Sequence, residues 1–140
     1  RDLGIGDRVR MVGFVPRNHV DRYYAASDLF VFSSITETQG LVLVEALALG
    51  TPVVALGVMG TLDVLNSEGG CIIAPEEPRA FANEVAFLIQ DPARYQYMAE
   101  CAVRYAASWS AEQKTQQILS QYTALVLRNT PDQNDNGLMH

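Results

Sequence analysis

The sequence predicts an α/β fold, in which a parallel sheet carries helices on both faces. Short apolar, β-branched runs alternate along the 140 residues with stretches whose apolar residues recur at helical spacing, and this alternation is typical of repeated strand–helix units. Hydrophobic residues make up 49% of the chain and charged residues 19%, which indicates a globular domain rather than a disordered chain.

Four short runs are the predicted strands. They cover residues 9–15, 29–32, 52–56 and 71–74. The second run, LFVF, is continuously apolar, which is typical of a strand that helices cover on both faces.

Two helices are predicted between the first three strands. The first runs from about Asn18 to Ala26 with Asn18 as its N-cap, because Pro16 ends the preceding strand. A polar loop over residues 33–39 leads into the second helix, residues 40–49, which a glycine and a proline terminate.

After the fourth strand the pattern is purely helical. Residues 78–90 form one helix, Asp91 and Pro92 open a second that ends near residue 108, and Ser110 starts a third. The apolar stripe of the first of these helices consists of Phe81, Val85, Leu88 and Ile89. The stripe of the last helix consists of Ile118, Leu119, Tyr122, Leu125 and Val126.

Residues 1–127 are expected to form one domain, and residues 128–140 a disordered tail without periodicity. The opening residues are typical of a helix end and a turn, so we expect a further strand and helix upstream. Without them, the sheet would have an uncovered edge, which folded proteins normally avoid.

Charge and composition exclude several classes of function. The net charge of −6 is opposite to what neutralising a nucleic-acid backbone requires. No apolar run has the 18 or more residues of a membrane-spanning helix. The two cysteines are too few for a disulfide framework, and the two histidines, His19 and His140, have no neighbours at metal-ligand spacing. We therefore expect a cytoplasmic domain that binds neither metal nor nucleic acid.

The stretch from residue 33 to residue 50, SSITETQGLVLVEALALG, is the part that predicts chemistry. Glu45 lies in a helix that is otherwise almost wholly apolar, where an ionised carboxylate is costly without a partner. Ligands of open parallel sheets bind beyond the carboxyl ends of the strands, where the helix start at Gly40 is expected. Free amides at a helix N-terminus can donate hydrogen bonds to a diphosphate, and a carboxylate one turn further can accept hydrogen bonds from ribose hydroxyls.

Simpler interpretations stay open for these residues. Glu45 could complement the helix dipole, Glu37 could be an ordinary loop residue, and Thr36 or Thr38 could be a helix cap. A hydrolase with two catalytic glutamates is a further alternative. Eight helical steps span about 12 Å, whereas the carboxylates of such a pair lie roughly 5 to 9.5 Å apart.

Two glutamates eight positions apart, a glycine three residues after the first, and the ending GTPVV resemble the donor-binding domain of family 4 glycosyltransferases. The segments GFVP, YYAASDLFVFSS and YAASWS extend this resemblance over nearly the whole chain. It implies a Rossmann-like domain that forms one half of the GT-B fold. It also implies that the parent enzyme transfers a sugar from a nucleoside-diphosphate donor, such as a UDP-sugar or a GDP-sugar, with retention of configuration.

The resemblance assigns roles to particular residues. It implies that Glu37 contacts a hydroxyl of the donor sugar as the catalytic residue and that Glu45 binds the ribose hydroxyls. The diphosphate would be held by the chain at Thr38, Gln39, Gly40, Leu41 and Val42. The backbone at Val15 and Pro16 would lie beside the base. No metal and no cofactor other than the donor are expected.

Departures from the family pattern concern the loop and the cations. Gln39 stands where the family often has phenylalanine, as in some lipid glycosyltransferases, and Ser33-Ser34 replaces a proline and a serine. The basic residues that neutralise the diphosphate in the family would lie upstream of this chain. The resemblance implies a nucleoside-diphosphate sugar and the acceptor-binding N-terminal domain of the same protein as partners. The variant at Gln39 is a hint of a lipid or lipid-linked acceptor, and with it of peripheral contact with the inner face of the membrane.

Two functions of other classes remain as alternatives. A sugar-nucleotide epimerase uses the same architecture, and a non-catalytic nucleotide-binding module would need only the donor site. We expect this chain alone to bind nucleotide weakly and to be inactive, because acceptor and donor cannot be brought together without the other half.

Overall fold

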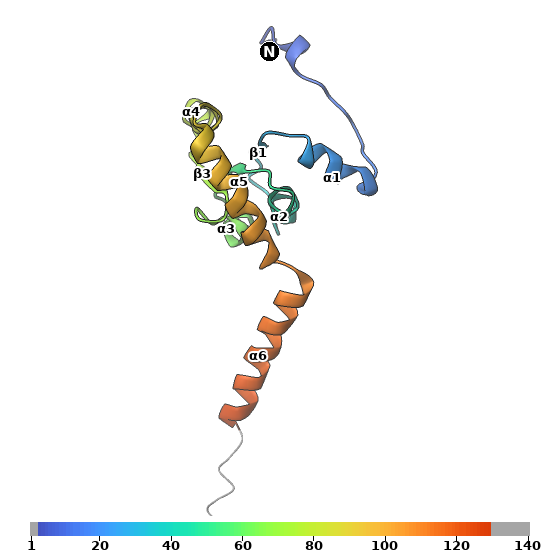
Figure 1. The fold of residues 1–140 in the computed structure, drawn as a ribbon, viewed down its shortest axis with the longest axis vertical. Helices are drawn as coiled ribbons and strands as arrows, with labels where there is room; N and C mark the ends of the chain where they lie inside the picture. Colours follow the sequence, from blue (N-terminus) through green and yellow to red (C-terminus); the bar gives the residue numbers. More distant parts are fainter. Residues whose placement is uncertain (1–2, 130–140) are drawn as a thin grey trace, which may run out of the picture.

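The computed structural model describes residues 3–129 (Figure 1). Its elements in chain order are η1 (Gly6–Arg8), α1 (Arg17–Ala25), β1 (Phe30–Phe32), α2 (Leu41–Ala48), β2 (Val53–Leu56), α3 (Thr61–Val64), β3 (Cys71–Ala74), α4 (Pro78–Gln90), α5 (Pro92–Ala107) and α6 (Ala111–Asn129).

The three strands form one parallel sheet in the order β1-β2-β3. Phe30 of β1 pairs with Val53 of β2, which pairs in turn with Cys71 of β3. Parallel strands need crossover connections, and here these run through α2 and α3. The loops that follow β1 and β2 therefore leave the sheet at the same edge.

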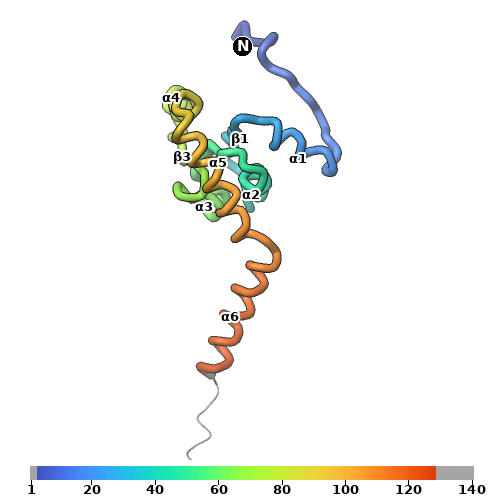
Figure 2. Tube along the Cα trace, viewed as in Figure 1, coloured from blue at the N-terminus to red at the C-terminus, as the bar shows by residue number. Residues whose placement is uncertain are grey.

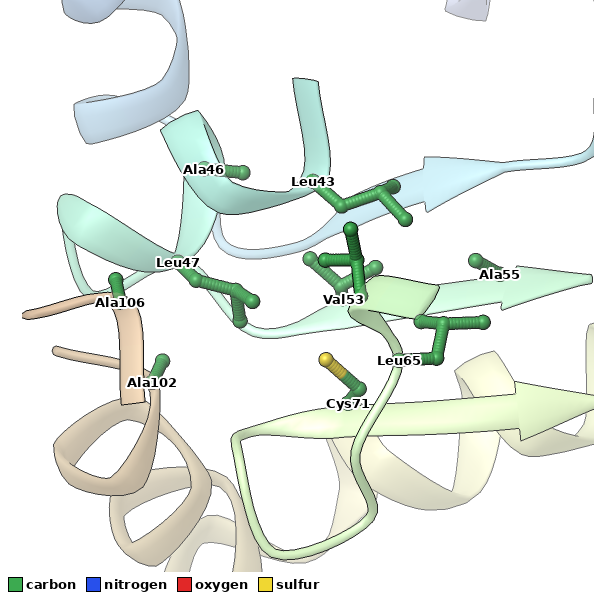
Figure 3. Close-up of a cluster of buried hydrophobic side chains, with 10 residues drawn as sticks. Leu43, Ala46, Leu47, Val53, Ala55, Leu65, Cys71, Ala102 and Ala106 are labelled. Atoms are coloured by element: carbon green, nitrogen blue, oxygen red, sulfur yellow. The ribbon is translucent and has the colours of Figure 1, made fainter. Parts of the chain in front are cut away.

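Side chains alternate between the two faces of the sheet and build a core on each. Figure 3 shows the larger one, where Leu43 and Leu47 of α2 meet Val53 of β2. Cys71 of β3 and Ala102 of α5 close this core from the other side. The second core includes Val54, Ile72, Ala74, Leu88 and Met98, from β2, β3, α4 and α5. Helices therefore cover both faces, as the sequence predicted, and the α/β class is confirmed.

The predicted first strand is wrong, because residues 9–15 form an extended segment that pairs with no strand of the described chain. This segment lies apart from the sheet and leads into α1 (Figure 2). Met11 is 89% exposed and Phe14 is 93% exposed. A β-strand is stabilised by backbone hydrogen bonds to a neighbour, and apolar composition alone does not supply one.

Two details around α1 and β1 also differ from expectation. Pro16, rather than Asn18, is the N-cap of α1, because its extended backbone leads directly into the helix while no side chain caps it. The strand β1 is an edge strand of the described sheet, and Val31 is 46% exposed on the face that was expected to be covered.

The other predicted elements are confirmed to within one or two residues. Strands occupy 30–32, 53–56 and 71–74, and α4 has the predicted bounds. The side chain of Asp91 accepts a hydrogen bond from the amide of Arg94, and Ser110 Oγ accepts one from Gln113, as N-caps of α5 and α6. The short helix α3 was missed, because its four residues carry no periodic signal.

The last helix, α6, projects away from the sheet (Figure 1). Its predicted apolar stripe is exposed, since Ile118 is 52%, Tyr122 64% and Val126 65% exposed. The helix continues to Asn129, so residues 128 and 129 of the expected tail are helical, and residues 130–140 lie outside the described chain. Within the described residues, no helix has the length and apolarity needed to cross a membrane.

Candidate functional site

A cavity of about 900 Å³ lies between α1, α2 and the segment that precedes α1. Its volume lies in the range of roughly 300 to 1,000 Å³ that is common for small-molecule sites. Apolar side chains form much of its wall, among them Phe14, Val15, Val20, Val42 and Leu49. The charged residues of the wall are Arg17, Asp21 and Glu45.

Glu45 is the fifth residue of α2 and is held by two groups of α1. Arg17 Nη2 lies 2.9 Å from its Oε1, and the hydroxyl of Tyr24 donates to its Oε2 at 3.4 Å. Dipole complementation falls off within the first turn of a helix, so it does not account for this position. These partners, together with the 34% of its side chain that is exposed to solvent, explain how a carboxylate is tolerated on an apolar helix. Burial, followed by the nearby Glu45 charge, raises the pKa of Tyr24.

Glu37 lies in the loop between β1 and α2, and its carboxylate folds back onto that loop. Its Oε1 accepts hydrogen bonds from the amides of Thr38, Gln39 and Gly40 at 3.1, 3.0 and 3.0 Å. The hydrogen bond from Gln39, followed by those from Gly40 and Thr38, lowers the pKa of Glu37. Neither Thr36 nor Thr38 caps α2, whose N-cap is Gly40 without a side-chain cap bond.

The N-terminus of α2 presents free amides beside this loop. Gly40 is buried and has a φ of +65°, a conformation that favours glycine, and it turns the chain into the helix. The amides of Leu41 and Val42 are the first two of α2, where helix geometry provides no intrahelical acceptor. The arrangement offers hydrogen-bond donors and a positive dipole end to an anion.

The structure brings part of the predicted site together. Val15, Val42 and Glu45 line one cavity, and Pro16 directly precedes α1 next to it. The loop residues from Glu37 to Gly40 form a second group around the start of α2, joined to the cavity through Val42. Glu37 and Glu45 have separate hydrogen-bonding partners among the described residues, the first in its own loop and the second in α1.

Arg17 was missed by the sequence analysis, and Tyr24 had no functional role in it. A carboxylate on an apolar helix requires a partner, and that requirement was the available signal. It could not say which of the chain's basic residues lies beside Glu45. Over the described part of the chain, no three His, Cys, Asp or Glu side chains form a group that could hold a metal ion.

A family model described as "Glycosyl transferases group 1" matches residues 1–105. Among curated proteins, D-inositol 3-phosphate glycosyltransferase 1 of Catenulispora acidiphila is 35% identical over 126 residues, which cover 89% of this chain and 30% of that protein. D-inositol 3-phosphate glycosyltransferase of Thermobispora bispora is 39% identical over 113 residues, covering 79% of this chain and 26% of that protein.

Solved structures share the fold at lower sequence identity. Sucrose-phosphate synthase from Thermosynechococcus elongatus aligns with a TM-score of 0.71 and 27% identity over 90% of this chain and 32% of that one. Anabaena HepE in complex with UDP-glucose aligns with a TM-score of 0.69 and 30% identity over 87% of this chain and 34% of that one. The chain spans about 30% of the length of the Catenulispora acidiphila relative.

Proposed function

The chain belongs to the group 1 glycosyltransferases, and we propose that it is the donor-binding domain of a retaining enzyme that transfers a sugar from a nucleoside-diphosphate sugar. The observation that carries the proposal is the position of Glu45. Its carboxylate lies in the wall of a largely apolar cavity, held by two side chains and one helix turn from the free amides of α2. The apolar cavity, the carboxylate and the free amides follow one another in the order of the base, the ribose and the diphosphate of a nucleotide.

The cavity is the proposed place of the nucleoside. In this proposal the segment at Val15 and Pro16 lies beside the base, and Glu45 accepts hydrogen bonds from the ribose hydroxyls. The HepE structure in complex with UDP-glucose supports a uridine donor, and a guanosine donor is the alternative to be tested beside it.

The diphosphate is proposed to lie at the N-terminus of α2. The amides of Leu41 and Val42 donate to its oxygens in our proposal. The backbone at Thr38, Gln39 and Gly40 lies beside the diphosphate and keeps its amides on Glu37 Oε1. No metal is required at this domain, because donors that stabilise the departing diphosphate supply the electrostatic support that often dominates such catalysis.

Glu37 is proposed to orient the donor sugar. Three amides occupy its Oε1, while no described residue donates to Oε2, so that oxygen is free to accept a sugar hydroxyl. Fixing one oxygen also fixes the direction of the other, and such positioning is what a transfer reaction requires.

The rest of the reaction depends on parts outside this chain. We propose that an N-terminal domain of the same protein binds the acceptor and that basic residues upstream of this chain neutralise the diphosphate. We also propose that the enzyme works in the cytoplasm, peripherally at the membrane if the acceptor is a lipid. The curated relatives named above are glycosyltransferases that their names assign to D-inositol 3-phosphate, so a polar inositol phosphate acceptor competes with a lipid one. Both relatives favour a transferase over an epimerase.

Calorimetric titration with UDP, GDP and their sugars tests the donor site. Glu45→Ala should raise the dissociation constant of the nucleotide that binds by roughly ten- to a hundredfold, because each lost hydrogen bond to a charged group is worth about 1.5–3 kcal/mol. Glu112→Ala, on the exposed start of α6, removes the same charge away from the cavity and should change nothing. Equal affinities for wild type and Glu45→Ala would contradict the ribose role.

Activity of the complete protein tests the reaction. Incubation with a UDP-sugar and either D-inositol 3-phosphate or a lipid acceptor should yield a glycoside whose anomeric configuration, read by nuclear magnetic resonance, equals that of the donor. An inverted product would contradict retention. Conversion of the UDP-sugar to its epimer without transfer would support the epimerase alternative instead.

A further inference from the structure

Two side chains of α1 fix the carboxylate of Glu45 from opposite ends. Arg17 contacts Oε1 at 2.9 Å and Tyr24 contacts Oε2 at 3.4 Å. A carboxylate has about four lone-pair sites. One partner on each oxygen leaves each of the two oxygens able to accept one further hydrogen bond.

Tyr24 is itself held in place by the core. Its ring packs edge-on against Phe30 with centroids 5.3 Å apart, and its carbonyl oxygen accepts a hydrogen bond from Thr51 Oγ1 at 2.8 Å. The hydroxyl of Tyr24 therefore presents a fixed donor to Glu45, so the direction of the carboxylate is set before any ligand arrives.

Arg17 is the more exposed partner. Its side chain is 90% exposed, against 34% for Glu45. Ion pairs this exposed contribute little to folding stability. Arg17 nevertheless lines the cavity, and its guanidinium offers a planar set of donors that a lysine lacks. Arg17 therefore contributes little to the fold and places a guanidinium in the cavity wall beside Glu45.

We propose that Arg17 and Tyr24 are positioning residues that aim both oxygens of Glu45 at adjacent hydroxyls, so that the site selects ribonucleotides over 2′-deoxyribonucleotides. The proposal rests on the proposed function. A ribose presents two adjacent hydroxyls to the two open acceptor positions, whereas a 2′-deoxyribose presents one. A carboxylate without these partners could rotate, and it would then keep a hydrogen bond to one ribose hydroxyl and lose the bond to the other.

The test is the ratio of dissociation constants for 2′-deoxy-UDP and UDP, measured by calorimetry on the complete protein, with 2′-deoxy-GDP and GDP in parallel. Wild type should prefer the ribonucleotide by about tenfold, the value of one hydrogen bond to a charged acceptor. Arg17→Met and Tyr24→Phe should each reduce this preference to about threefold or less, because the second contact is no longer held in place.

Matched variants separate positioning from charge and from folding. Arg17→Met also removes a cation and should weaken the binding of both the ribonucleotide and the 2′-deoxyribonucleotide, but that effect cancels in the ratio of their dissociation constants. Arg17→Lys should recover part of the preference. Arg22→Met removes a cation from the same helix away from Glu45 and should keep the wild-type ratio. Melting temperatures of all variants show whether each one folds.

Each outcome decides the question. A ratio that stays at the wild-type value in both Arg17→Met and Tyr24→Phe overturns the positioning role while the proposed function stands. A wild type that binds UDP and 2′-deoxy-UDP equally overturns the selection of ribonucleotides. Failure of the complete wild-type protein to bind UDP or GDP overturns the proposed function, and this inference with it.

Discussion

The amide of Gly60 donates a hydrogen bond of 3.0 Å to the carbonyl oxygen of Glu37. This bond ties the loop after β2 to the loop after β1, which carries the proposed catalytic glutamate. The two backbones approach so closely that a Cβ on Gly60 would lie 2.1 Å from the carbonyl oxygen of Thr38. The shape of the proposed diphosphate loop therefore depends on a residue 23 positions further along the chain, outside the motif that identified it.

Gly60→Ala should displace the loop that carries Glu37. The φ of Gly60 is −64°, which alanine adopts readily, so any effect is due to the added methyl group. Overpacking typically costs about 1–3 kcal/mol, and we expect a loss of this size in denaturant unfolding together with weaker nucleotide binding. Gly6→Ala is the matched control, because nothing lies within 4 Å of its Cβ position. Wild-type stability and affinity in Gly60→Ala would show that the loops are not coupled.

Acidification should remove the contribution of Glu37 to stability. The lowered pKa means that the folded protein favours the carboxylate, so this contribution is present above the ordinary value of 4.5 and is lost as pH falls through the depressed value. The difference in melting temperature between wild type and Glu37→Gln should therefore shrink from about pH 7 to about pH 3. Glu112→Gln controls for the loss of one exposed charge. A difference that is independent of pH would contradict the role of the three amide hydrogen bonds.

Leu88 and Ile89 are adjacent in α4 and face opposite environments. Leu88 is fully buried in the second core, whereas Ile89 is 56% exposed. Leu88→Ala should lower the free energy of unfolding by about 2–5 kcal/mol because it leaves a cavity, and Ile89→Ala should cost roughly 0.5 kcal/mol, as is usual at the surface. Urea unfolding of both variants measures this contrast. Equal losses would place the boundary of the core elsewhere.

Thr61 organises the turn after β2 through its hydroxyl. Thr61 is fully buried, and its Oγ1 accepts from the amide of Val58 at 2.9 Å and lies 2.7 Å from the carbonyl oxygen of Leu56. Thr61→Val keeps the shape but leaves these groups unsatisfied, at a cost of about 1–3 kcal/mol.

Thr115→Val is the control for Thr61→Val, because Thr115 bonds a helix carbonyl on exposed α6. Thermal unfolding should show a clear loss for Thr61→Val and little for Thr115→Val. A shift of equal size in both would mean that the buried hydroxyl has no special role.

Local signals account for the elements that were predicted well. Asp91-Pro92 marks a helix start by itself, and the stripe through Leu88 defines α4 without knowledge of its neighbours. The segment at residues 9–15 carried an equally strong local signal and formed no strand, because pairing depends on another part of the molecule. The stripe of α6 likewise predicted a helix correctly, while its exposure was invisible to periodicity.

The α/β class, the positions of most helices and strands, and the family indicated by Glu37 and Glu45 could all be predicted from the amino-acid sequence, because they depend on residue type and short spacing. The amides that hold Glu37 belong to the next three residues, whereas the partners of Glu45 are known only from the packing of the folded chain. Arg17 and Glu45 are 28 residues apart, and their contact exists because α1 packs against α2. Contacts of that kind arise from the packing of whole elements, and no pattern along the chain encodes them locally.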